Sequence, residues 1–501
     1  MAHCKVFFLV VEAAEPALLN QWMDAGLLPQ LSALRDRSLH GPVRGLRGIG
    51  ANAIWPSVYT GVGPATHGLY YHDQPESGSY QAEKENRTRV EQQTIWGAAS
   101  DEGQLVGLVD LPRAFTSKQF NGIQVIDWNT HFSPPGCESY PSALEEQIAE
   151  RLGEPAACVC LARQYREPDP ADVAGALARL GQSVKHTTAL IDDQLPSRNW
   201  DLFLTSFDQL HCAGHLLWHR HDRSHPWHLA GADADCDPLL SLCQDIDTAV
   251  GRVLDQLPDS CRIVLFAGPG MGPSYVRPEL LDAILVALDK RRPSTSRKLI
   301  GALKTLWHHV PQSWRQGLST VARKADRTLQ GRDRSSRPCY SVRSNDSVGG
   351  IRVNLEGREA NGMITAAEME SYCDRLIAAI KAIRIVDNGE PLVTDIFRTN
   401  QIYHGQCIDQ LPDILIEWNQ TCAISALTSP DIGLIRQDRL PDWSGTHTGR
   451  SMAMIHLPGR GQGRLPDDAS VLDIAPTLAE LCGLPGLESE GKSLLAGATT
   501  S

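Results

Sequence analysis

The chain lacks the long hydrophobic runs and the cysteine spacings that mark membrane proteins and disulfide-stabilised proteins. Its first apolar run, residues 6–11, is too short to cross a bilayer, and no signal-peptide cleavage pattern accompanies it. The 13 cysteines are scattered without Cys-x-x-Cys spacing, so neither a disulfide framework nor a structural zinc knuckle is predicted. We therefore expect a protein of a reducing, cytoplasmic compartment with no membrane span.

The sequence also lacks an overall excess of basic residues and any internal repeat. Its formal net charge is −12, which argues against a nucleic-acid-binding surface over the whole molecule. A length of 501 residues suits one large α/β unit with insertions, or two domains that share a sheet. The composition leaves the oligomeric state open.

Short apolar segments alternate with helical patterns along most of the chain. Pro16 is expected to open a helix directly after the first strand, and Thr365 to Glu368 has the pattern of a capping box. The expected strands are residues 6–11, 105–109, 125–126, 202–204, 263–266, 351–355, 413–418 and 452–455, with helices at 173–191, 239–257, 365–383 and after 471. This alternation predicts a doubly wound, mostly parallel sheet with helices on both faces.

The composition changes between Lys290 and Arg337, where 13 Lys or Arg stand against two Asp. This predicts an inserted helical and basic segment at 290–340, between a first core part at 1–289 and a second at 341–495. The insertion has two interpretations: a lid over an anionic substrate, or a solvated arm, which is the simpler one.

Two histidines four residues apart, His211 and His215, form the most informative local pattern. On a helix they share one face and can bind one metal ion. They follow the apolar segment 200–207, and open α/β sheets keep their sites at the carboxyl ends of strands. The alternative is a chance pairing, because six of the 17 histidines lie between His211 and His228.

Several motifs, taken in order, resemble the alkaline-phosphatase superfamily, in particular its type I phosphodiesterase/nucleotide pyrophosphatase branch. The resemblance spans nearly the whole chain and implies that superfamily's α/β fold. The motifs that carry it are Glu12 after the first strand, residues 54–61 (IWPSVYTG), 64–68 (PATHG), the His211–His215 turn, 266–272 (FAGPGMG), 445–447 (GTH) and 471–477 (VLDIAPT).

The resemblance implies one complete metal site and one incomplete site. His211, in the place of the family's Asp, would bind zinc together with His215 and His447, and three imidazoles leave one coordination position open. At the second site, Glu12 is the one plausible ligand, because Gly268 and Pro269 replace an Asp-His pair. Ala51 stands at the position of the nucleophile, so a covalent two-metal mechanism is not available. We expect one zinc ion per chain.

The remaining candidate residues have weaker support. Glu12 is a candidate general base, and Asn52 is a candidate for catalysis and for binding a substrate oxygen. Ser57 and Thr60 are alternative nucleophiles. His131 and Arg352 are further candidates for substrate binding, although each is equally well explained as a packing or ion-pairing residue.

The leading hypothesis is a zinc-dependent hydrolase or group-transfer enzyme, with a small anionic or ester substrate such as a phosphoester or pyrophosphate. Two alternatives remain open. One is a non-catalytic ligand-binding or structural member of the family, which the loss of the nucleophile permits. The other is a biosynthetic acyl, sulfuryl or carbamoyl transferase that uses zinc as a Lewis acid.

Overall fold

The computed structural model divides into two compact units that are interleaved along the chain. Unit 1 comprises residues 1–63, 87–274 and 442–501, and unit 2 comprises 64–86 and 275–441. These boundaries do not coincide with the predicted breaks at 289 and 340. The residues that the structure describes are 3–71, 73–75, 78–80, 82–84, 90–117, 119–129, 137–153, 170–228, 237–289, 331–344 and 347–500. Most of the predicted basic insertion therefore lies outside the described residues.

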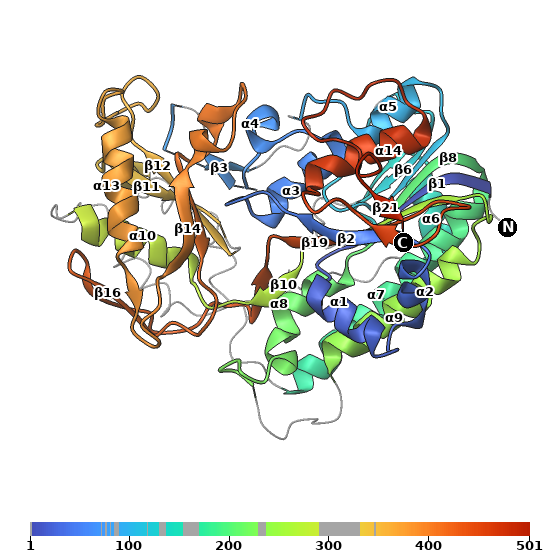
Figure 1. Ribbon diagram of the computed structural model, residues 1–501, viewed down its shortest axis with the longest axis horizontal. Helices are drawn as coiled ribbons and strands as arrows, with labels where there is room; N and C mark the ends of the chain where they lie inside the picture. Colours follow the sequence, from blue (N-terminus) through green and yellow to red (C-terminus); the bar gives the residue numbers. More distant parts are fainter. Residues whose placement is uncertain are drawn as a thin grey trace. The chain divides into compact units, whose positions relative to one another are not determined.

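Unit 1 is built on a ten-stranded sheet whose central strands are parallel (Figure 1). The strand β1 (His3–Val11) lies at its centre, and residues 6–11 are buried on both faces, as the continuous apolar run predicts. In order across the sheet, the strands are β21 (Thr499–Thr500), β20 (Gly463–Arg464), β2 (Leu39–Arg44), β19 (Arg450–His456), β9 (Arg262–Ala267), β1, β8 (Asn199–Phe207), β5 (Val106–Val109), β6 (Gly122–Ile126) and β7 (Glu138–Tyr140).

Helices cover both faces of this sheet (Figure 1). One group consists of α1 (Pro16–Asp24), α2 (Pro29–Arg35), α6 (Leu144–Leu152), α7 (Pro170–Gln194), α8 (Gln209–His221) and α9 (Pro238–Leu254), and the other of α3 (Ala51–Thr60), α5 (Ile95–Asp101) and α14 (Ile474–Cys482). The helix α1 begins at Pro16, as predicted, and Glu15 accepts a hydrogen bond from the backbone N–H of Ala17. The predicted α/β class, with a mostly parallel sheet, is confirmed.

Unit 2 has its own, antiparallel sheets. Four strands pair in the order β11 (Cys339–Val342), β12 (Val348–Val353), β15 (Ile414–Trp418) and β14 (Val393–Arg398), and three more pair as β13 (Arg384–Ile385), β16 (Ala426–Ser429) and β17 (Gly433–Arg436). The unit also contains the pair β3 (Asp73–Pro75) and β4 (Ala82–Lys84) and the helices α4 (Pro64–His67), α10 (Pro278–Asp289) and α13 (Met369–Lys381). Apolar residues of α10 and α13 pack against the strands in one buried cluster.

One predicted helix start needs correction. The Thr365 hydroxyl donates its hydrogen bond to the Glu368 carboxylate at 2.7 Å, and no side-chain cap is recorded for α13, which begins at Met369. A capping box is instead formed by Ser470 and Asp473, ahead of the 3-10 turn η5 (Val471–Asp473) that leads into α14. None of the described helices is long and apolar enough to cross a membrane.

Candidate metal centre

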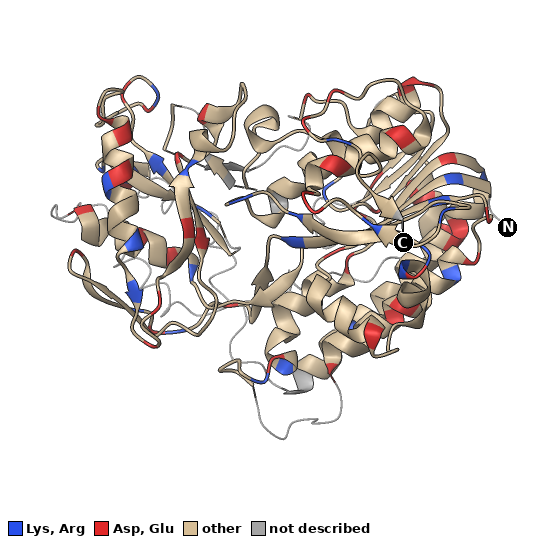
Figure 2. Ribbon diagram, in the orientation of Figure 1, with Lys and Arg blue, Asp and Glu red and all other residues tan. Residues whose placement is uncertain are grey.

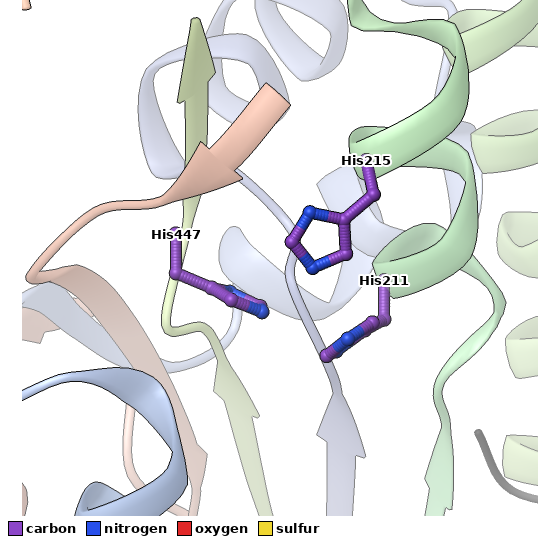
Figure 3. A group of neighbouring side chains, drawn as sticks. All are labelled: His211, His215 and His447. Carbon is purple, nitrogen blue, oxygen red and sulfur yellow. The ribbon is translucent and has the colours of Figure 1, made fainter. Parts of the chain in front are cut away.

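The structure brings His211, His215 and His447 together within unit 1. His211 and His215 lie one turn apart on α8, and His447 ends the short strand β18 (Gly445–His447). Their ring centroids are 4.6 to 5.1 Å apart, and one nitrogen from each ring lies within 4.8 Å of the others (Figure 3). All three side chains are buried, with residue exposures of 5% or less. The fold thus brings His447 next to two histidines that are more than 230 residues away in the sequence.

Two neighbouring elements hold β18 against α8. The strand β10 (Met271–Pro273) pairs antiparallel with β18, so that Met271 lies opposite His447. The backbone N–H of Ser444 donates to the His215 carbonyl at 2.9 Å. Gly445 approaches α8 so closely that a side chain there would overlap the Gly214 carbonyl. Glycine at 445 is therefore required for the third histidine to reach the other two.

Each of the three rings has its Nδ1 atom beside an oxygen acceptor. His215 Nδ1 lies 2.8 Å from the Gly445 carbonyl, and His447 Nδ1 lies 3.4 Å from the Pro269 carbonyl. A carbonyl oxygen can only accept, so both Nδ1 atoms carry the proton. His211 Nδ1 lies 3.3 Å from Oε1 of Glu12. With Nδ1 engaged in every ring, Nε2 is the nitrogen that remains for a metal ion.

Carboxylates gather at the carboxyl ends of the neighbouring strands. Glu12 follows β1, Asp208 follows β8 and Asp110 follows β5, and all three residues are at least 95% buried. Burial raises the pKa of Glu12 well above its usual value, and the nearby Asp208 raises it further, while Trp55 and Arg113 oppose this rise. A bound cation would oppose this rise and favour the charged forms of these carboxylates.

The structure places the other predicted site residues as follows. Asn52 lies in the first turn of α3, but its side chain is outside the described part of the structure, as is the whole of His131. Arg352 belongs to unit 2, where its buried guanidinium lies 2.6 Å from Glu359 and donates to the carbonyls of Asp409 and Leu411. These contacts account for the charge of Arg352 within unit 2 and agree with its interpretation as an ion-pairing residue.

The alternative nucleophiles are both fully buried in α3. The Thr60 hydroxyl donates to the Pro56 carbonyl at 2.7 Å, which commits it to the helix backbone, and Ser57 is 0% exposed. Position 51 carries alanine at the start of the same helix. The structure therefore gives no support for either hydroxyl as a replacement for the nucleophile that position 51 lacks.

No sequence pattern points to the Gly445 and Pro269 carbonyls as acceptors, because every residue has a carbonyl. Asp208 could have been found, since it directly follows the strand that leads to His211. The other histidines of the segment are used differently: His221 pairs with Asp237 at 2.6 Å, and His228 donates to the His219 carbonyl. The described cysteines are free thiols, as expected.

The family model for type I phosphodiesterase / nucleotide pyrophosphatase matches residues 6–447. The chain belongs to this family. No curated relative matches the sequence. Two similar solved structures are of phosphonoacetate hydrolase from Sinorhizobium meliloti 1021, in complex with phosphonoformate and with phosphonoacetate. Each alignment covers 96% of this chain and 96% of the hydrolase chain at 13% sequence identity, and the TM-scores are 0.53 and 0.54. This likeness supports the alkaline-phosphatase-like fold.

Proposed function

We propose that the protein is a hydrolase of a phosphoester or a related phosphorus compound and that it works with a single zinc ion held by His211, His215 and His447. The observation that carries the proposal is the common orientation of the three imidazoles. Each Nδ1 is beside an oxygen, and one nitrogen of each buried ring lies within 4.8 Å of the others, so the three imidazoles can bind one metal ion. Three imidazoles form a donor set typical of catalytic zinc, and a bound zinc ion would polarise a substrate oxygen and acidify water.

The residues of the chain indicate that water, and not a side chain, is the nucleophile. Ala51 has no group that can attack phosphorus, and the Thr60 hydroxyl is committed to the Pro56 carbonyl. Attack by water forms one bond to phosphorus and breaks the bond to the leaving group, without a covalent enzyme intermediate. We assign Glu12 as the acceptor of the water's proton, because its Oε2 atom has no hydrogen-bond partner among the described residues.

Asn52 completes the proposal as a substrate-binding residue. Its place in the first turn of α3 puts it next to the former nucleophile position, at the helix end whose N–H groups favour anions. We propose that its amide donates to a substrate oxygen. The substrate class rests on the family and on the structurally similar phosphonoacetate hydrolase, which carries phosphonate ligands.

Elemental analysis of the purified protein tests the metal assignment. We expect about one zinc per chain. His215→Ala should lose most of the zinc and keep its far-UV circular dichroism, because the buried apolar strands maintain the sheet. His221→Ala is the matched control: it removes a histidine from the same helix that is paired with Asp237, and it should keep the metal. Two tightly bound zinc ions per chain, or full occupancy in His215→Ala, would contradict the assignment.

A substrate panel tests the reaction. The zinc-loaded protein should hydrolyse at least one of a phosphodiester, a pyrophosphate and a phosphonate, and His215→Ala should lose at least a hundredfold in kcat/KM. Asn52→Ala should raise KM more than it lowers kcat if the amide binds substrate. Absence of hydrolysis across the panel by fully zinc-loaded protein would favour the non-catalytic alternative.

A further inference from the structure

We propose that Glu12 is a positioning residue for the metal centre, acting through His211, and that the Pro269 carbonyl does the same for His447. Both positions belong to the half of the site that resembles a second metal site. In this chain they support the imidazoles of the first one. The inference rests on the proposed zinc site, but it assigns the outer contacts of that site and makes separate predictions.

The contact between Glu12 and His211 is built into the central sheet. Glu12 extends β1 by one residue, and its backbone N–H donates to the Phe207 carbonyl of β8 at 2.9 Å. After β8, the chain turns directly into α8, where the His211 N–H donates to the Asp208 carbonyl. Carboxylate and imidazole are therefore held by adjacent parallel strands. Glu12 is 0% exposed, so the contact between Oε1 and Nδ1 is shielded from bulk solvent.

The Pro269 carbonyl is held by two neighbouring backbone hydrogen bonds. The Gly270 N–H donates to the Arg450 carbonyl at 2.7 Å, and the Thr448 N–H donates to the Gly270 carbonyl at 2.8 Å. These bonds tie the loop after β9 to the segment that follows His447. The acceptor for His447 Nδ1 is thereby fixed by the same backbone that positions the histidine.

The space beside Gly268 excludes a further metal-binding side chain. Gly268 has a φ of 135°, which side-chain-bearing residues rarely adopt. A Cβ at this position would overlap the hydroxyl and the Cβ of Ser451, which is 2% exposed. An aspartate at 268 would need β19 to move. At position 268, the chain therefore lacks a metal-binding side chain, and Ser451 occupies the space that such a side chain would need.

The two carbonyl acceptors cannot be removed by substitution, but Glu12 can. An outer carboxylate fixes the ring orientation of a metal-binding histidine and raises its basicity, and its loss typically lowers metal affinity 10- to 100-fold. The effect must pass through the protonation of His211 Nδ1. That atom gives a readout that a purely structural role for Glu12 would not change.

The experiment measures zinc affinity by competition with a chromophoric chelator for the wild type, Glu12→Ala and Glu12→Gln. We expect Glu12→Ala to bind zinc at least tenfold more weakly and Glu12→Gln, which keeps an oxygen acceptor of the same size, to be intermediate. Glu15→Gln is the matched control, because Glu15 is a buried glutamate three residues away that pairs with Arg450 at 2.9 Å. Its zinc affinity should change less than threefold.

Nitrogen-15 NMR of the histidine rings supplies the second readout. In the zinc-loaded wild type the proton of His211 should reside on Nδ1, and in Glu12→Ala this resonance should shift or broaden while those of His215 and His447 stay in place. Glu12→Gln, as a near-isosteric variant, keeps the test valid if Glu12→Ala does not fold. Unchanged affinity and an unchanged His211 resonance in both variants would overturn the inference. A wild type that binds no zinc would instead overturn the proposed function.

Gly268→Asp tests the filled half of the site. We expect this variant to bind no second zinc ion, because Ser451 occupies the space that its side chain needs. The measurement is the zinc content by elemental analysis, at equal protein concentration and with circular dichroism as the check of folding. Two zinc ions per folded chain would show that the space is open and would contradict this part of the inference.

Discussion

Two buried glutamates, one in each unit, have opposite surroundings. In unit 2, Glu359 has a fully buried side chain whose Oε1 lies 2.6 Å from Arg352 and 3.0 Å from Arg358. In unit 1, the Glu12 side chain is equally buried, but its Oε1 lies 3.3 Å from Nδ1 of His211, and burial together with Asp208 raises its pKa. A buried carboxylate with two guanidinium partners is part of the fold. One left beside an imidazole, with a raised pKa, marks a functional site.

The comparison also explains why arginine is a misleading signal in this sequence. Arg352 and Arg358 stand six residues apart and could bind a substrate anion, but Arg358 contacts both oxygens of Asp413 at 2.7 Å and also reaches Glu359. Acidic and basic residues are mixed along the strands and helices of both units (Figure 2).

The largest expected effect comes from breaking the pairing of Glu359. Arg352→Ala leaves a buried carboxylate with one of its two partners and two carbonyls without their donor. We expect the free energy of unfolding of unit 2 to fall by roughly 3 to 5 kcal/mol, measured by chemical denaturation. The zinc content of the folded protein should not change.

A double variant sharpens this result. Arg352→Met combined with Glu359→Gln removes both charges, so it should recover a large part of the lost stability, because the single variant is penalised mainly for an incompletely paired buried charge. If the double variant is as unstable as Arg352→Ala, the two carbonyl contacts and not the ion pair carry the effect.

A smaller effect is expected for the pH dependence of unit 1, which contains the buried carboxylate of Asp110. Asp110 accepts hydrogen bonds from the N–H groups of Trp128 and Asn129, but burial, and then Asp208, raise its pKa well above the usual value. A raised pKa in the folded state means that the folded protein binds the proton more tightly. Its contribution to stability is therefore present below the unfolded-state pKa of about 4 and declines as the pH rises above it.

Asp110→Asn tests this sign. The amide keeps one of the two acceptor oxygens, so one of the contacts from Trp128 and Asn129 is lost at every pH, and asparagine tolerates the positive φ of 50° at this position. The variant should lose stability less steeply than the wild type between about pH 4 and the raised pKa of Asp110, as followed by thermal unfolding of metal-free protein over a pH series. A steeper decline in the variant would mean that the Asp110 carboxylate is stabilised as an anion.

The smallest effect distinguishes two capping patterns, one from each unit. Ser470→Ala removes a complete capping box in unit 1 and should cost about 1 kcal/mol of unfolding free energy. Thr365→Ala in unit 2 removes a hydroxyl that donates to the exposed Glu368 side chain and caps no backbone N–H, so it should cost less than about 0.5 kcal/mol. Equal losses in differential scanning calorimetry would show that the Thr365 turn also stabilises α13.

Much of the framework of the metal centre could be predicted from the sequence. The apolar run 6–11 and its neighbours become parallel strands, and a four-residue spacing places His211 and His215 on one face of α8. These predictions depend on local periodicity, which tertiary contacts reinforce here. The distant ligand His447 came from the order of family motifs and not from any local pattern.

The amino-acid sequence by itself determined the class of fold and the three candidate metal-binding histidines, and it places no hydroxyl or thiol at position 51, because each of these depends on which side chains are present. Only the tertiary structure decided which atoms face one another. The acceptors for His215 and His447 are backbone carbonyls, which every residue has, and the partner of His211 lies 199 residues away. Likewise, an arginine can bind a ligand or form an ion pair within the protein. The structure shows that Arg352 pairs with the buried Glu359.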